Sequence, residues 1–299
     1  MTMPETTTPL SPPRWRNFGL AVLVLVLGFA VPLWHLARFV VKDELHSYIP
    51  LIPLVSFYLV WLQREKLPRH SAPARKLAAF FFAAGLGLMA WWWTASFAEE
   101  NYLSLAMLAW LFFLAAAGGE FLGGAVMRAV AFPFGLLIFT VPLPIFLRTG
   151  IETGLQHGSA RVADWMFTLS GLPAFRDGMN FQLPGMSLQV APECSGIHST
   201  LVLFITSLLA AQMFLRRPGH RAVLVLAVIP LALARNGFRI LVIGELCTRI
   251  GPEMINSPIH RHGGPLFFVL SLLPFFLLLY FIRKSERPRV SRPLPTTVN

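Results

Sequence analysis

The sequence contains little charge and few acidic residues. Charged residues make up 13% of its 299 residues, whereas hydrophobic residues make up 55%. In a typical soluble domain about a quarter of the residues are charged. This deficit excludes an ordinary soluble domain and indicates a protein that lies in a membrane.

Cysteine is nearly absent as well. The two cysteines, Cys194 and Cys247, are too few for a disulfide-rich scaffold or a cysteine zinc cluster. The glycine-rich stretch GGEFLGG at 118–124 lacks the Gly-Lys-Ser/Thr ending of a phosphate-binding loop. Neither a cysteine zinc site nor a nucleotide-binding loop is therefore indicated.

Long apolar runs are abundant, and each is long enough for a helix that crosses about 30 Å of hydrocarbon. We predict an all-α fold, a polytopic transmembrane helix bundle of about eight spans. The predicted spans lie at 18–36, 48–63, 77–97, 102–119, 129–147, 195–215, 221–245 and 265–282. Pro133, Pro142 and Pro144 break the fifth span and make its outer end irregular, and Pro230 predicts a kink in the seventh.

The spans form one expected domain over residues 17–285. Disordered segments are expected on either side of it, at 1–16 and at 286–299, because both are rich in proline and polar residues.

Basic residues outnumber acidic ones, 25 to 14, and give a net charge of +11. They flank the apolar runs, so we interpret them as topology determinants beside anionic membrane lipids and expect no nucleic-acid partner. With the N-terminus in the cytoplasm, the cytoplasmic segments hold more than twice as many Lys and Arg residues as the opposite side. The charge pattern therefore predicts that both termini are cytoplasmic.

The longest segment predicted on the extracytoplasmic side precedes Cys194. Residues 150–170 are expected to form an amphipathic helix against the membrane. Its predicted apolar side consists of Leu155, Val162, Trp165, Met166 and Leu169. Residues 177–191 are predicted to form a short hairpin, with turns at Asp177-Gly178 and Pro184-Gly185.

Cys194 stands where this polar segment meets the apolar span 195–215, next to Glu193 and Ser195. The start of a helix favours a thiolate, so Cys194 is a candidate nucleophile. Two other interpretations stay open. The residue can be a small buried apolar side chain, or it can form a disulfide with Cys247 on an oxidising face.

Arg235, Asn236 and Arg239 lie inside the predicted span 221–245. Arginine inside a membrane helix is unfavourable by about 2.5–3.5 kcal/mol on insertion scales, so such residues usually face a bundle interior and serve a function. The two arginines are four residues apart and share one helix face. The alternative is that they reach the interface and bind lipid phosphate.

His260 and His262 lie just before the last span, on the same predicted side as Cys194. Histidine acts as an acid or a base near neutral pH, although a pair of interfacial loop histidines is the plainer alternative. A His-x-His pair offers two metal ligands and no third is evident, so no metal and no cofactor is expected.

Three motifs together resemble the exosortase/archaeosortase family of membrane enzymes. They are the stretch ECSG at 193–196, the pattern N-x-x-R-I at 236–240, and the pattern H-x-x-x-G-x-x-x-F at 260–268. The last match favours His260 over His262. The stretch that begins at His46 also resembles an early element of the family, but Tyr48 stands where glycine is usual, so His46 has less weight.

The resemblance implies a cysteine transpeptidase or protease that cleaves a C-terminal sorting signal of secreted proteins at the outer face of the bacterial inner membrane. It implies Cys194 as nucleophile, Arg239 as the cation that stabilises thiolate and oxyanion, and His260 as acid and base. Arg235, Asn236, Glu193, Ser195 and His262 are expected to bind substrate or support these three. The implied partners are secreted proteins with a signal of the Pro-Glu-Pro type and membrane lipids, with a lipid or glycan as a possible acceptor.

Two other functions fit an arginine-bearing membrane helix. A transporter would use the arginines as an anion site and would not need Cys194, but it would show inverted repeats or paired broken helices, which are not evident in this sequence. A glycan-assembly enzyme would use them to hold a polyprenyl phosphate, but it would more often carry an acidic metal site.

Overall fold

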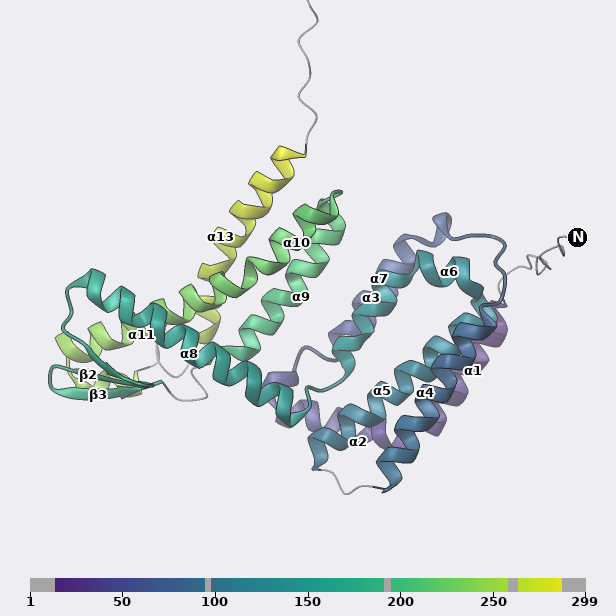
Figure 1. The fold of residues 1–299 in the computed structure, drawn as a ribbon, viewed down its shortest axis with the longest axis horizontal. Helices are drawn as coiled ribbons and strands as arrows, with labels where there is room; N and C mark the ends of the chain where they lie inside the picture. The colour runs from purple at the N-terminus through teal and green to yellow at the C-terminus, as the bar shows by residue number, and fades with distance from the viewer. Residues whose placement is uncertain (1–13, 95–97, 191–194, 258–262, 287–299) are drawn as a thin grey trace, which may run out of the picture. The chain divides into compact units, whose positions relative to one another are not determined.

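The computed structural model describes residues 14–94, 98–190, 195–257 and 263–286, and these are mostly helical (Figure 1). The chain divides into two compact units, residues 1–148 and 149–299. Six described helices are long and apolar enough to cross a membrane, or up to eight if each of two bent pairs is one span. The predicted all-α transmembrane bundle is therefore confirmed.

Unit 1 is built from helices alone in the described part of the chain. Its elements are α1 (Trp15–Gly28), α2 (Ala30–Lys42), η1 (Glu44–His46), α3 (Leu51–Leu62), η2 (Arg64–Lys66), α4 (Arg75–Thr94), α5 (Glu99–Ala117), η3 (Gly118–Leu122), α6 (Gly123–Ala129), α7 (Ala131–Leu136), η4 (Leu137–Thr140) and the beginning of α8 (Ile145–Ser170).

The predicted span 18–36 contains a bend that was not predicted, because the chain turns by 70° between α1 and α2. Pro32 has no N–H group, so it cannot donate to the carbonyl of Gly28, the residue at which α1 ends. The break predicted near the end of the fifth span is confirmed, since Ala131–Thr140 and Ile145–Ser170 meet at 91°. Pro142 and Pro144 lie in that break.

Unit 2 contains the rest of α8 and the elements that follow it. These are β1 (Phe175–Asp177), β2 (Asn180–Leu183), β3 (Met186–Gln189), α9 (Ile197–Phe214), α10 (Pro218–Leu226), α11 (Val228–Arg249), η6 (Pro252–Asn256) and α13 (Gly264–Ser285). The helix breaks at Ala227, between α10 and α11. Pro230 cannot donate to the carbonyl of Leu226, which accounts for the interruption, and the predicted kink itself stays a prediction.

The predicted hairpin at 177–191 is part of a three-stranded sheet. β1, β2 and β3 form an antiparallel sheet in that order, with two tight turns. Gly178 and Gly185 have φ angles of +61° and +84°, a left-handed conformation that favours glycine. Both turns were predicted, but the strand Phe175–Asp177 was not.

The sheet covers one end of α8 and α11, as Figure 1 shows for unit 2. Phe181, Leu188 and Val190 of the sheet region pack in one buried cluster with Phe167 of α8 and Ile243 of α11. Trp165 and Leu169, on the predicted apolar side of α8, are exposed, and a different face packs inward, which consists of Ser159, Ala160, Ala163 and Phe167. That the apolar side lies against the membrane stays a prediction.

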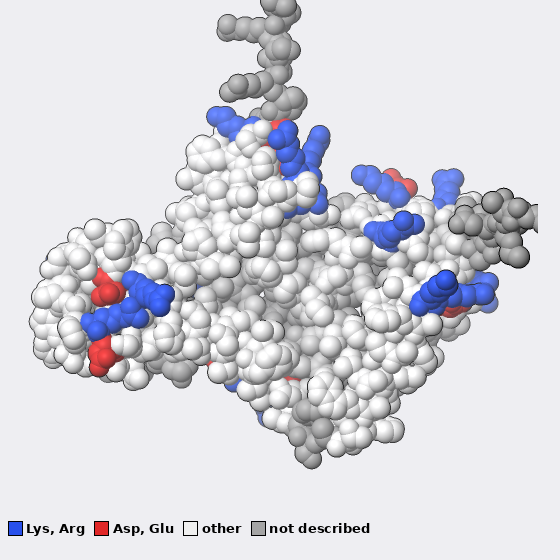
Figure 2. All heavy atoms as spheres, in the orientation of Figure 1, with Lys and Arg blue, Asp and Glu red and all other residues white. Residues whose placement is uncertain are grey.

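Lys and Arg side chains gather at one end of unit 2, where α9 and α13 end and α10 begins (Figure 2). They are Arg216, Arg217, Arg221, Arg283 and Lys284. Glu286 accepts hydrogen bonds from the backbone N–H groups of Arg216 and Arg217, each at 2.9 Å, and from Nδ1 of His220 at 3.0 Å. This carboxylate therefore ties the end of α13 to the start of α10.

We predict that this tie makes stability depend on pH in the acid range. Hydrogen bonds from the backbone of Arg216 and Arg217, and then from His220, lower the pKa of Glu286 to about 2. A depressed carboxyl pKa contributes stability that is complete above its ordinary value of about 4.5 and is lost as the pH falls through 2. Thermal unfolding in detergent should therefore show a decline over this window that the Glu286→Gln variant lacks. Parallel curves for the two proteins would contradict the role of Glu286.

Candidate active site

Ser195 and Gly196 lie at the entrance of α9, directly after Cys194 in the chain. Gly196 has a φ angle of +67° and is the residue before the first turn of the helix. A Cβ atom at this position would lie 2.6 Å from Oδ1 of Asn236 and 2.7 Å from Nη2 of Arg235. Glycine is therefore required twice, by its backbone conformation and by the close approach of α11.

Two side chains of α11 hold this entrance. Nη2 of Arg235 donates to the carbonyl of Gly196 at 3.2 Å and to Oγ1 of Thr200 at 3.3 Å. Nδ2 of Asn236 donates to the carbonyl of Ser195 at 2.5 Å. Arg235 and Asn236 retain 7% and 3% of their exposed area. The ECSG and N-x-x-R-I motifs, separate in the sequence, are therefore in direct contact.

The other side of the Cys194 segment is held by α8. Nε2 of Gln156 donates to the carbonyl of Val190 at 3.3 Å, next to the end of β3. Val190 is buried in the cluster formed by the sheet, α8 and α11. The chain between Val190 and Ser195 therefore starts and ends at fixed points. Sequence reasoning missed Gln156 and Thr200, because nothing local distinguishes them from other polar helix residues.

Small residues bring α8 and α11 close together beside this entrance. A Cβ atom on Gly237 would lie 2.7 Å from Val162, and one on Gly158 would lie 2.7 Å from Leu233. Glycine at helix contacts allows backbones to approach closely in membrane proteins. The helix that carries Arg235 and Asn236 is thereby fixed against α8, which carries Gln156.

Arg239 lies one turn after Arg235 on α11 and is partly buried. A guanidinium in this position is a cation within the helix bundle, as the sequence predicts. Glu193, Cys194, His260 and His262 lie outside the described residues. The contacts of Arg239 with Cys194 and His260 therefore stay a prediction.

The state of Cys247 bears on the alternative that Cys194 forms a disulfide with it. It is a free thiol, 3% exposed, and packs among apolar residues of α8, the sheet and α11. The disulfide between Cys194 and Cys247 is therefore wrong, and Cys247 acts as a small apolar residue.

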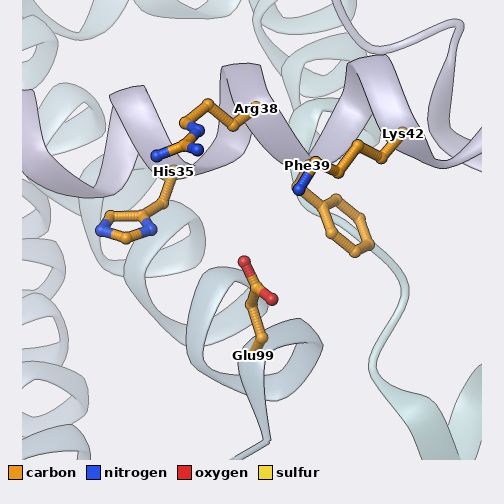
Figure 3. Close-up of a pocket in the computed structure, with 5 residues that line it drawn as sticks. All are labelled: His35, Arg38, Phe39, Lys42 and Glu99. Atoms are coloured by element: carbon orange, nitrogen blue, oxygen red, sulfur yellow. The ribbon is translucent and has the colours of Figure 1, made fainter.

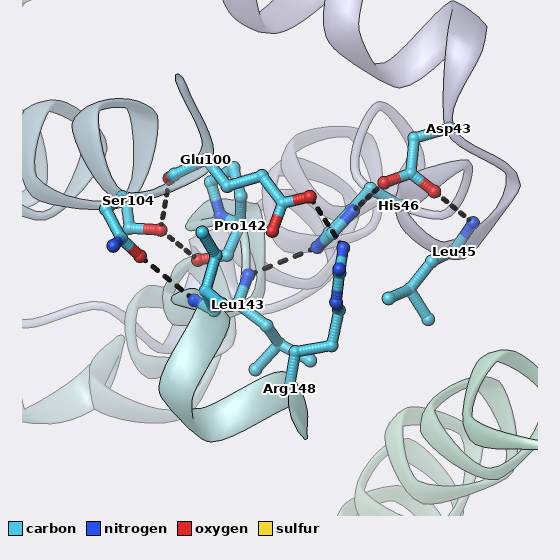
Figure 4. A network of polar contacts seen from close by, with 10 residues as sticks. Asp43, Leu45, His46, Glu100, Ser104, Pro142, Leu143 and Arg148 are labelled. Atoms are coloured by element: carbon cyan, nitrogen blue, oxygen red, sulfur yellow. Dashed lines mark hydrogen bonds and ion pairs between the residues drawn. The ribbon is translucent and has the colours of Figure 1, made fainter. Parts of the chain in front are cut away.

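His46 has a structural position in unit 1 (Figure 4). Its ring is fully buried, with Nδ1 3.0 Å from Oδ2 of Asp43. The backbone N–H of Leu143 donates to Nε2 at 3.2 Å. Since Nε2 accepts a hydrogen bond, the ring proton lies on Nδ1 and is donated to Asp43. Both ring nitrogens are occupied, which leaves none for proton transfer to a substrate.

Side chains of α5 also form hydrogen bonds with the irregular segment between α7 and α8, which contains Pro142 and Pro144. Oγ of Ser104 donates to the carbonyl of Pro142 at 2.8 Å, and Oδ1 of Asn101 accepts from the N–H of Ile145 at 2.9 Å. Nη1 of Arg148 lies 2.6 Å from Oε1 of Glu100, and both side chains are more than two-thirds buried. The backbone freed by Pro142 and Pro144 is thus bonded to side chains within unit 1.

We predict that the Glu100–Arg148 pair stabilises unit 1 measurably. A hydrogen bond to a charged group contributes about 1.5–3 kcal/mol, and loss of one partner leaves the other charge buried. Glu100→Gln should lower the thermal unfolding midpoint in detergent by several degrees. In the double variant Glu100→Gln/Arg148→Gln the loss should be smaller than the sum of the two single losses. Additive losses would show that the pair makes no net interaction.

A cavity of about 260 Å³ lies between α2 and the start of α5 (Figure 3). His35, Arg38 and Lys42 come from α2, and Glu99 comes from α5. None of the predicted site residues lines it. Among the residues that the structure describes, no group of three or more His, Cys, Asp or Glu side chains is placed to hold a metal ion.

The family model described as transmembrane exosortase (Exosortase_EpsH) matches residues 40–277. The chain belongs to the transmembrane exosortase family. Comparison with curated proteins and with solved structures returned no match. The matched range includes all three motifs, and in this exosortase the first two meet at the entrance of α9.

We predict that Gly196 is essential for processing by this exosortase. Gly196→Ala must adopt an unfavourable left-handed backbone and push Arg235 and Asn236 away, so activity should fall by roughly tenfold or more. Gly171 is a matched control, since its φ angle is +74° and a Cβ atom added there would meet no atom within 4 Å. Gly171→Ala carries the same backbone strain without the collision and should retain most activity. Equal losses in the two variants would attribute the effect to strain alone.

Proposed function

We propose that this exosortase is a membrane cysteine peptidase or transpeptidase. Its proposed substrates are secreted proteins that end in a sorting signal, which consists of a short Pro-Glu-Pro-type motif, a transmembrane helix and a basic tail. Membership of the exosortase family supports the class of enzyme, and the Cys194, Arg239 and His260 motifs support the cysteine mechanism.

The observation that carries the proposal is the fixed position of both flanks of Cys194. Asn236 holds the carbonyl of Ser195, and Gln156 holds the carbonyl of Val190. A nucleophile must be held within a fraction of an ångström of its productive geometry, and buried hydrogen bonds to its neighbours do this. A residue with a merely apolar role would not need its flanking backbone tied by an arginine and an asparagine.

The proposed reaction has two steps. The thiolate sulfur of Cys194 attacks the scissile carbonyl carbon, and the C–N bond breaks as His260 gives a proton to the leaving amine. The product is a thioester between Cys194 and the secreted protein. His260 then takes a proton from the acceptor, which attacks the thioester and releases the thiolate.

The remaining site residues support this reaction. Arg239 stabilises the thiolate and the oxyanion with two directed N–H groups. Arg235 and Asn236 hold the backbone that follows Cys194. The proposed role of Glu193, Ser195 and His262 is to bind substrate or support the other three. The acceptor is water, or an amine or hydroxyl of a lipid or glycan.

The proposed orientation places this site outside the cytoplasm, in the bacterial inner membrane. In unit 2 the basic residues that follow α9, and those of α10 and α13, gather at one end (Figure 2). α9 runs from Ser195 and Gly196 at its start to Arg216 and Arg217 after its end, so the two lie about one helix length apart. The positive-inside rule then puts the basic end in the cytoplasm and Cys194 on the opposite face.

The proposal is tested by co-expression with a secreted protein that carries such a signal. The chain should shorten the protein by the mass of the signal helix and tail, as measured by immunoblot and intact mass. A signal with the motif scrambled but the helix and tail retained is the matched control and should stay full length. No change in size with the intact signals tested, at normal expression of the enzyme, would contradict the proposed activity.

A further inference from the structure

A groove with a volume of about 580 Å³ lies in unit 1, between the start of α1 and the end of α3 with the segment that follows it. Trp15 of α1 lines one side, and Phe57, Val60 and Trp61 of α3 line the other. Arg64 and Arg69, in the segment after α3, close its end. None of these residues belongs to the proposed active site.

The floor of this groove is apolar and open. Phe57 is 72% exposed, Trp61 is 50% exposed and Trp15 is 46% exposed. Phe57, Val60 and Trp61 recur at three- and four-residue intervals and share one face of α3, and Arg64 follows in η2 (Arg64–Lys66). The apolar side chains of this face therefore lie next to the guanidinium of Arg64.

Two arginines, Arg64 and Arg69, line the groove. The guanidinium of Arg64 lies over the ring of Trp61, 4.5 Å from its centroid. Stacking uses the faces of a guanidinium and leaves its N–H edges available for an anion. Neither Arg64 nor Arg69 makes an ion pair with a described carboxylate, whereas Arg75 at the same end lies 3.8 Å from Glu120.

We propose that this groove binds one acidic phospholipid. Its phosphate would accept hydrogen bonds from Arg64 and Arg69, and its acyl chain would lie along Phe57, Val60 and Trp15. A free phosphate leaves the apolar floor uncovered. A zwitterionic lipid brings a cation close to two guanidinium groups, so an acidic headgroup is the better match. The volume lies within the range of small-molecule sites. This proposal does not depend on the proposed peptidase function.

Native mass spectrometry of the full-length protein in detergent tests the proposal. The probes are phosphatidylglycerol and phosphatidylcholine with identical acyl chains at equal concentration. The wild type should retain the acidic lipid about tenfold more than the zwitterionic one, because only phosphatidylcholine places a quaternary ammonium beside the two guanidinium groups. Arg64→Gln/Arg69→Gln should bring the two lipids to similar levels.

The control variant Lys66→Gln/Lys76→Gln removes two positive charges from the same end without touching the groove. It should keep the preference of the wild type. Phe57→Ala should weaken both lipids, since it shortens the apolar floor. A preference that survives Arg64→Gln/Arg69→Gln, or one that the control variant loses equally, would overturn the site. Displacement of the lipid by millimolar inorganic phosphate would also overturn it, by showing a simple anion site.

Discussion

Cys194→Ala is expected to leave the substrate at full length in cells that make normal amounts of the enzyme. The proposed thioester cannot form without the sulfur, and no other described residue stands in its place. Both flanks of the segment, Val190 and Ser195, keep their hydrogen bonds through backbone atoms. The variant should therefore fold normally and lose chemistry alone.

The matched control is Cys247→Ala. Cys247 is buried and free, and its sulfur contributes only packing in the apolar cluster. Loss of that sulfur should destabilise the protein by roughly 1 kcal/mol and leave processing near the wild-type level. Immunoblots of enzyme and substrate in the same cells give both quantities. Processing by Cys194→Ala at the wild-type rate would refute the nucleophile.

Arg239→Lys is expected to lose most processing, by about a hundredfold, at a normal protein level. Loss of one oxyanion donor costs about 10²–10³ in rate in other hydrolases, and a single ammonium cannot supply two directed N–H groups from one plane. Arg235→Lys should retain much more activity. Both hydrogen bonds of Arg235, to Gly196 and Thr200, come from the one nitrogen Nη2, which an ammonium group can replace.

The comparison of these two variants separates chemistry from folding. Both arginines lie on α11, and Arg235 is the more buried, so folding defects would make Arg235→Lys the worse variant. The proposed mechanism predicts the opposite order. Substrate cleavage in membranes, measured at matched enzyme levels, distinguishes them. Wild-type activity of Arg239→Lys would remove Arg239 from the mechanism.

The helices could be predicted from the sequence because apolar length is a local property. The breaks at Pro142, Pro144 and Pro230 were predicted for the same reason. The 70° bend between α1 and α2 was missed, although its cause is also local. Pro32 removes the hydrogen bond to Gly28, and the apolar run continues across it, so hydropathy alone does not show the bend.

The candidate site was predicted in part. The motifs indicated that Ser195, Arg235 and Asn236 belong together, and their contacts agree. Gln156 could not be predicted, since its partner is a backbone carbonyl 34 residues away that any sequence would provide. His46 attracted attention through the family motif, but its contacts with Asp43 and Leu143 give it a structural role.

The central claim, a covalent thioester at Cys194, is tested most directly by mass spectrometry of the enzyme during turnover. Purified enzyme is mixed with substrate, quenched in acid and digested. The peptide that contains Cys194 should carry the acyl part of the cleaved substrate, and hydroxylamine should remove it. Turnover with an unmodified Cys194, or an adduct on another residue, would contradict the account.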